Sequence, residues 1–158
     1  MVQDGHNAQG QEQEKDELET LLREIGERFE VDFKPLTFND SVFEVLDVNN
    51  MRQYLDRLVQ TKALKNPLKD LPLWAKIWPG SFVLETYLRK KVACAGKSLL
   101  ELGAGCAVLS ILASRLGFSH ITASDVEDMA LLFARANVLK NNLQEQIDVR
   151  HIDVTRPG

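Results

Sequence analysis

The sequence predicts an α/β fold: the N-terminal part of a doubly wound parallel sheet, preceded by a helical or mixed N-terminal extension. Two observations carry this prediction. In the second half of the chain, short apolar runs alternate with helix-length amphipathic segments, which is typical of strand–helix–strand units. The first of these runs, residues 98–102, is nearly all apolar, as a central strand should be. With 158 residues and 44% hydrophobic content, the chain can bury a core of its own.

The first 70 residues divide into a tail and an extension. Residues 1–16 are polar and rich in Gln, Glu and Gly, which predicts a disordered tail. Residues 17–70 form the extension, which opens with an apolar stripe at helical spacing from Leu18 to Phe29. Residues 31–48 predict one or two short strands, interrupted by Pro35.

A second helix is expected from about Met51. Its residues Met51, Tyr54, Leu55, Leu58 and Val59 are spaced for one helix face. Asn49 or Asn50 can cap its first turn, and Asn66-Pro67 marks its end.

The second part, residues 71–158, contains the front part of the parallel sheet. Residues 71–80 predict a loop that holds both tryptophans of the chain, and a helix follows over about 81–91. Strands and helices then alternate: strand 98–102, helix 108–116, strand 120–123, helix 127–140 and strand 147–152.

One edge of the expected sheet lacks a neighbour. In doubly wound folds the first strand has neighbours on both sides, and this chain supplies later strands for one side alone. A bare apolar edge recruits partners. We therefore expect that later strands are absent because the chain is truncated, or that another copy or chain covers the edge, so that self-association is possible.

Composition excludes several classes of function. The net charge of −4 gives no basic surface for nucleic acid, and no apolar run approaches the length needed to cross a membrane. The polar, acidic N-terminus is neither a secretory signal nor a transit peptide. Cys94 and Cys106 form neither a disulfide framework nor a metal-binding spacing, so we expect no metal and a cytoplasmic location.

A glycine turn after strand 98–102 is the main candidate for a ligand site. Gly103 and Gly105 suit a tight turn from a strand into a helix, although a plain structural turn has the same pattern. Val108 stands where dinucleotide-binding turns carry a third glycine, which disfavours NAD. Glu101, two residues before the turn, would repel a pyrophosphate and would suit the ammonium and sulfonium groups of S-adenosylmethionine.

Three further residues are candidates for this site. Asp125, twenty residues after Gly105, stands where an acidic residue binds ribose hydroxyls, and it could also cap the following helix. Asp153 ends the third strand and could accept a hydrogen bond from an adenine amino group, or be an ordinary loop residue. Trp78 could line the cleft or be a plain core or lid residue.

Residues 73–158 resemble the seven-stranded, Rossmann-like (class I) S-adenosylmethionine-dependent methyltransferases. The marks are Trp-Ala-Lys-Ile-Trp-Pro-Gly at 74–80, Gly-Lys-Ser-Leu-Leu-Glu-Leu-Gly-Ala-Gly-Cys at 96–106 and Ala-Ser-Asp at 123–125. Within that family the chain is most similar to the protein-lysine methyltransferases that include the electron transfer flavoprotein β-subunit enzyme. The resemblance implies cofactor contacts at Trp78, Gly103, Ala104, Gly105 and Asp125.

The same resemblance places Glu101 beneath the methionine part of the cofactor and Asp153 near the adenine. Ala107 departs from the family pattern, which commonly has a glycine there. The substrate-facing residues of the family lie beyond Gly158, so the catalytic residues are unknown.

The expected function is therefore methyl transfer from S-adenosylmethionine, with a protein lysine amine as the acceptor and a protein as the partner. Two alternatives stay open: a non-catalytic cofactor-binding fragment or regulatory module that docks a partner, and an oxidoreductase that binds NAD.

Overall fold

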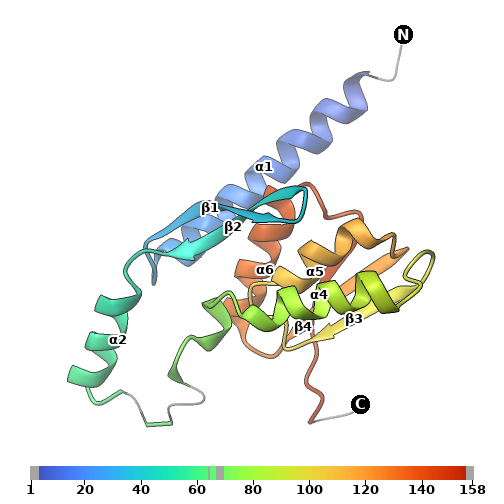
Figure 1. Cartoon of the computed structure of the whole chain (residues 1–158). Coiled ribbons are helices and arrows are strands. Elements are labelled where there is room, and N and C mark those ends of the chain that lie inside the picture. Colours follow the sequence, from blue (N-terminus) through green and yellow to red (C-terminus); the bar gives the residue numbers. More distant parts are fainter. Residues whose placement is uncertain (1–3, 64, 67–69, 156–158) are drawn as a thin grey trace.

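The computed structural model describes residues 4–63, 65–66 and 70–155. The extension comprises helix α1 (Asp4–Gly26), strands β1 (Val31–Phe38) and β2 (Ser41–Val48), and helix α2 (Met51–Gln60). The second part comprises the short helix η1 (Leu73–Ala75), α4 (Pro79–Lys91), β3 (Ser98–Leu102), α5 (Val108–Ala113), η2 (Ser114–Leu116), β4 (His120–Asp125), α6 (Asp128–Lys140) and β5 (Ile147–His151). Figure 1 shows the two parts side by side, with the N-terminal half of α1 extending beyond them.

The second part is built on a parallel sheet of order β3-β4-β5, which confirms the predicted α/β fold. Both crossovers lead in the same direction along the sheet. Because such crossovers are right-handed, the helices they contain, α5 and α6, fall on the same face. The paired residues Leu99, Ile121 and Ile147 point into the core on that face.

The opposite face of the sheet carries no helix in the part of the chain that the structure describes. Leu100 and Leu102 lie there and are 55% and 54% exposed. β3 is also an edge strand among the described residues, as the sequence predicted.

The extension packs against α6. β1 and β2 form an antiparallel hairpin closed at Asn39, whose positive φ of 50° is tolerated by asparagine. Buried side chains of β2, including Phe43 and Leu46, join the same core as the α/β part. Figure 1 shows the hairpin next to α6, and α1 also contacts that helix.

Three expectations for the extension were wrong. α2 ends at Gln60, before the expected end at Asn66-Pro67, and Pro67 lies outside the described residues. Residues 4–16 form the first half of α1 instead of a disordered tail; Met1 to Gln3 lie outside the described residues. The segment contains strong helix formers, and Gln144 anchors it by donating to Glu14 at 2.6 Å. Asn50 stands at the N-cap of α2 but makes no capping bond, because its side chain accepts from the Glu30 N–H at 3.0 Å.

The predicted elements of the second part are all present, with shifted ends. α4 begins two residues early at Pro79, a residue suited to a first helical turn. β4 continues to Asp125, and the helix expected over 108–116 becomes α5 followed by η2. Among the described residues, no helix has the length and apolar character needed to cross a membrane.

Candidate cofactor-binding site

The glycine loop (residues 103–107) joins β3 to α5 and is held in left-handed backbone conformations. Gly103, Gly105 and Ala107 have φ values of 66°, 54° and 60°. A Cβ at Gly103 would meet nothing within 4 Å, whereas a Cβ at Gly105 would lie 2.6 Å from the Trp74 carbonyl oxygen. Gly103 therefore leaves open space beside the loop, and Gly105 permits a close backbone approach.

The N–H groups of residues 104–107 in the glycine loop are hydrogen-bonded within the protein. Ala104 donates to the Ser124 carbonyl at 2.8 Å, and Gly105 donates to Oδ2 of Asp125 at 2.8 Å. Cys106 donates to the Trp74 carbonyl at 3.1 Å, and Ala107 to the Ala104 carbonyl at 2.8 Å. The loop thus presents none of these four donors to a ligand.

Asp125 ends β4 and orders the loops on both sides of it. Besides the Gly105 N–H, it receives the N–H groups of Val126 at 2.8 Å and Glu127 at 3.1 Å on Oδ1. It therefore precedes α6 as a loop acceptor and does not cap it, because the N-cap residue is Glu127. A carboxylate offers about four acceptor positions, so one stays available for a ligand hydroxyl.

Glu101 lies on the core face of β3 and is bound to the first turn of α5. Its Oε2 accepts from the Ser110 N–H at 3.0 Å and from the Ser110 hydroxyl at 2.6 Å. Burial raises the pKa of Glu101 above its ordinary value, and the negative charge of Asp125 adds to that increase. Glu101 does not line the cavity described next, and its expected place beneath a cofactor stays a prediction.

Two adjoining cavities meet at the glycine loop. The first, of about 270 Å³, is bounded by residues from the loop before α4, the glycine loop and the end of β4: Leu71, Leu73, Trp74, Lys76, Trp78, Ser81, Gly103, Ala104, Gly105, Cys106, Val108, Asp125 and Glu127. The second, of about 520 Å³, shares Gly103, Asp125 and Glu127 with it and extends to Asp153. Together the two cavities are lined by six of the seven predicted site residues.

Asp153 lies in the second cavity, where its Oδ1 accepts from the Thr155 N–H at 2.9 Å and the Thr155 hydroxyl at 2.6 Å. These hydrogen bonds lower the pKa of its carboxyl, so the group is ionised at neutral pH. Asp153 is thus a third carboxylate, after Asp125 and Glu127, in the lining of these adjoining cavities.

Both tryptophans line the first cavity. Trp74 packs edge-on against Phe133, with 5.0 Å between ring centroids, and so joins the loop to the core. Trp78 is half exposed, donates from Nε1 to the Leu73 carbonyl at 3.0 Å, and carries the Lys76 ammonium over its ring at 4.7 Å. Sequence reasoning missed Trp74 and Lys76 as lining residues, although both belong to the tryptophan segment that carried the resemblance.

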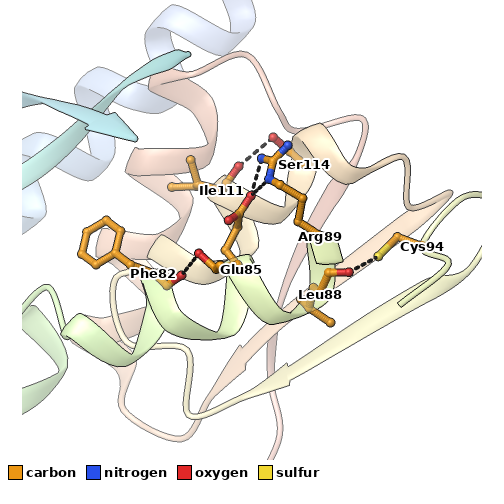
Figure 2. Close-up of polar contacts among 8 residues, drawn as sticks. Phe82, Glu85, Leu88, Arg89, Cys94, Ile111 and Ser114 are labelled. Carbon is orange, nitrogen blue, oxygen red and sulfur yellow. Dashed lines mark hydrogen bonds and ion pairs between the residues drawn. The ribbon is translucent and has the colours of Figure 1, made fainter. Parts of the chain in front are cut away.

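Helix α4, which follows Trp78, contains an ion pair between a buried carboxylate and a partly exposed arginine. Glu85 is fully buried, and its Oε1 accepts from Nε of Arg89 at 2.8 Å and pairs with a second guanidinium nitrogen. Figure 2 shows both side chains on the flank of α4 that faces α5. The other oxygen, Oε2, has no hydrogen-bond partner among the described residues. The sequence alone gave no sign of this buried carboxylate.

No metal or nucleophile is evident at the site. Among the described residues, no group of His, Cys, Asp and Glu could hold a metal ion. Burial raises the pKa of the Cys106 thiol to about 12, so this cysteine is an inert packed side chain.

Comparison with known proteins finds a sequence match for the segment around these cavities. Residues 82–156 match the family described as ribosomal protein L11 methyltransferase (PrmA). S-adenosylmethionine is the cofactor on which that family depends.

Proteins to which this chain is similar include two lysine methyltransferases. The electron transfer flavoprotein beta subunit lysine methyltransferase of Rattus norvegicus is 38% identical over 94 residues, which cover 58% of this chain and 36% of the relative. Its homolog in Caenorhabditis elegans is 40% identical over 80 residues, covering 50% of this chain and 32% of the relative. The ribosomal protein L11 methyltransferase of Thermosipho africanus is 32% identical over 123 residues, covering 77% and 42%. The chain thus spans about a third to two fifths of these curated relatives.

Among solved structures, the METTL16 methyltransferase domain aligns with a TM-score of 0.39 and 15% identity, over 89% of this chain and 57% of that one.

Proposed function

We propose that this protein is an S-adenosylmethionine-dependent methyltransferase that modifies a lysine amine on a protein. The cofactor assignment rests on one observation: the N–H groups of residues 104–107 are already hydrogen-bonded to acceptors within the protein. A dinucleotide pyrophosphate binds through free N–H groups at the turn and at the start of the next helix. Here the N–H groups of residues 104–107 already have acceptors, and Glu101 accepts the Ser110 N–H of α5. These contacts favour a nucleoside without a pyrophosphate over NAD.

The charges of the site favour the same ligand. Asp125 and Glu127 border the first cavity, and the Glu101 carboxylate is close enough to Asp125 for their charges to interact. S-adenosylmethionine supplies an electrophilic methyl group on a cationic sulfur, beside an ammonium group. Carboxylates around a partly closed cavity stabilise such cationic groups.

The residues present fit the parts of this cofactor. Asp125 would accept a ribose hydroxyl through its remaining acceptor position, and Asp153 would lie near the adenine in the second cavity. The space at Gly103, where a Cβ would meet no atom, allows the ligand to approach the backbone. Trp74 and Trp78 would enclose the methionine end and exclude water from it.

A protein substrate is supported by the names of the relatives. The lysine methyltransferases are named for the electron transfer flavoprotein beta subunit, and the other relatives are named for ribosomal protein L11. Both of these acceptors are proteins, and the two lysine methyltransferases named above are 38% and 40% identical to this chain.

Cofactor binding can be measured directly, because both tryptophans of the chain line the first cavity. We expect S-adenosylmethionine and its demethylated product to change tryptophan emission saturably and to give matching isothermal titration curves, whereas NAD does neither. Trp78→Phe should keep binding and reduce the optical signal. Binding of NAD in preference to S-adenosylmethionine would refute the cofactor assignment.

Methyl transfer is tested separately. The full chain is incubated with methyl-labelled S-adenosylmethionine and purified electron transfer flavoprotein beta subunit or ribosomal protein L11. Mass spectrometry should find the label on a lysine of one of them. Cofactor binding without transfer to any protein in a lysate would instead support the non-catalytic alternative.

A further inference from the structure

A single buried amide connects the N-terminal hairpin to the glycine loop. Asn137 of α6 is fully buried, and its Oδ1 accepts from the Leu46 N–H of β2 at 2.7 Å. Its Nδ2 donates to the Cys106 carbonyl of the glycine loop at 2.8 Å. Leu46 and Cys106 lie 91 and 31 residues away along the chain, so Asn137 unites three distant segments.

The bond to Cys106 restrains a specific peptide plane. The Cys106 carbonyl belongs to the peptide unit that enters Ala107, a buried non-glycine residue held at φ 60° and ψ 30°. This conformation is unfavourable for alanine, so rotation of that peptide would relieve strain. The Nδ2 donor opposes such a rotation, because the Cys106 carbonyl would lose its buried partner.

Asn141, the C-cap residue of α6, makes a comparable pair of bonds to the hairpin, and its Nδ2 also donates to the Asn137 backbone carbonyl at 2.7 Å. Its Oδ1 accepts from the Glu44 N–H at 2.9 Å, and its Nδ2 donates to the Glu44 carbonyl at 2.7 Å. Both side chains therefore fix β2 to α6, and the contact with the glycine loop distinguishes Asn137 from Asn141.

We propose that Asn137 is a positioning residue for the glycine loop and couples the geometry of that loop to the docking of hairpin β1–β2. Its role in cofactor affinity rests on the function proposed above. The hairpin therefore belongs to the structure that shapes the cofactor site, although none of its residues borders the first cavity.

The test compares Asn137→Ala with the matched control Asn141→Ala in the full chain. Amide hydrogen exchange reports the loop directly. In Asn137→Ala we expect exchange at residues 105–107 to accelerate about tenfold relative to β4. In Asn141→Ala exchange should accelerate at β2 and leave the loop unchanged. Equal loop exchange in the two variants would overturn the proposal.

Cofactor affinity is the second readout, measured well below the melting temperature of each variant. Asn137→Ala should weaken S-adenosylmethionine binding about tenfold, and Asn141→Ala by less than about twofold. If the unmodified protein binds no S-adenosylmethionine, the proposed function fails, and loop exchange alone still decides the role of Asn137.

A near-isosteric variant covers the case in which Asn137→Ala does not fold. Asn137→Asp keeps an acceptor for the Leu46 N–H, and its protonated carboxyl can donate to Cys106 whereas its carboxylate cannot. Loop exchange, corrected for the intrinsic effect of pH, should match the unmodified protein at pH 5 and exceed it at pH 8. Protection that is unaffected by the substitution at both pH values would overturn the proposal.

Discussion

Replacing Gly105 by alanine should destabilise the fold, because the added methyl group would clash with the backbone of Trp74. Its Cβ would lie 2.6 Å from the Trp74 carbonyl oxygen and 3.3 Å from the Trp74 Cα. The left-handed backbone at Gly105 adds about 1–2 kcal/mol of strain for a residue with a Cβ. Overpacking against a backbone that cannot rotate away adds about 1–3 kcal/mol. We therefore expect Gly105→Ala to lower the free energy of unfolding by about 2–5 kcal/mol.

Two other glycines provide controls for this prediction. Gly96 and Gly103 also have positive φ, and a Cβ at either would meet nothing within 4 Å. Gly96→Ala and Gly103→Ala should each cost about 1–2 kcal/mol, from backbone strain alone. Urea denaturation of the three variants measures the difference. A loss for Gly105→Ala no larger than that for Gly96→Ala would refute the argument from the Trp74 contact.

Three further predictions concern strain and buried charge. Ala107→Gly should stabilise the fold by about 1 kcal/mol, seen as a higher melting temperature, because glycine adopts the left-handed conformation freely; an unchanged or lower melting temperature would contradict this. The raised folded-state pKa of Glu101 means that its ionisation opposes folding, so stability is lost as pH rises from the unfolded-state pKa toward the folded one. Glu101→Gln should therefore be more stable than the unmodified protein at pH 8 but not at pH 4. If urea denaturation gave the same difference in free energy of unfolding between the two proteins at both pH values, this prediction would be contradicted. Arg89→Ala should lower the free energy of unfolding by about 2–3 kcal/mol in urea denaturation. This loss is smaller than for a fully buried ion pair, because the Arg89 side chain is 43% exposed. Glu85→Met should leave the free energy of unfolding nearly unchanged in the same assay.

Much of the α/β part could be predicted because its signals are local. Strands 98–102 and 147–152 and the helices between them follow from apolar spacing within each segment. Gly103 and Gly105 could be recognised as a turn because tight turns require glycine at defined positions. The extension was harder to predict, because residues 4–16 lack an apolar stripe and yet form the first half of α1, a helix that packs on α6.

The partners of individual polar side chains could not be predicted. Asp125 was expected to cap a helix or bind a ligand, and it accepts the Gly105 N–H from twenty residues away. Asn49 or Asn50 was expected to cap α2, and the Asn50 side chain accepts from the Glu30 N–H instead. In each case the side-chain oxygen accepts a backbone N–H group, as predicted. Which N–H group it accepts depends on the backbone segment that the fold brings within about 3 Å.

The amino-acid sequence by itself determined the order of strands and helices, the glycine turn and the carboxylates beside it, because periodicity and turn chemistry act between near neighbours. Only the tertiary structure decided that the N–H groups of residues 104–107 are hydrogen-bonded within the protein, that the buried Glu85 carboxylate pairs with Arg89, and that Asn137 bonds to both the hairpin and the glycine loop. The physical reason is that a hydrogen bond requires atoms within a few ångströms of each other, and residues 31 and 91 positions apart reach that distance only after the chain has folded.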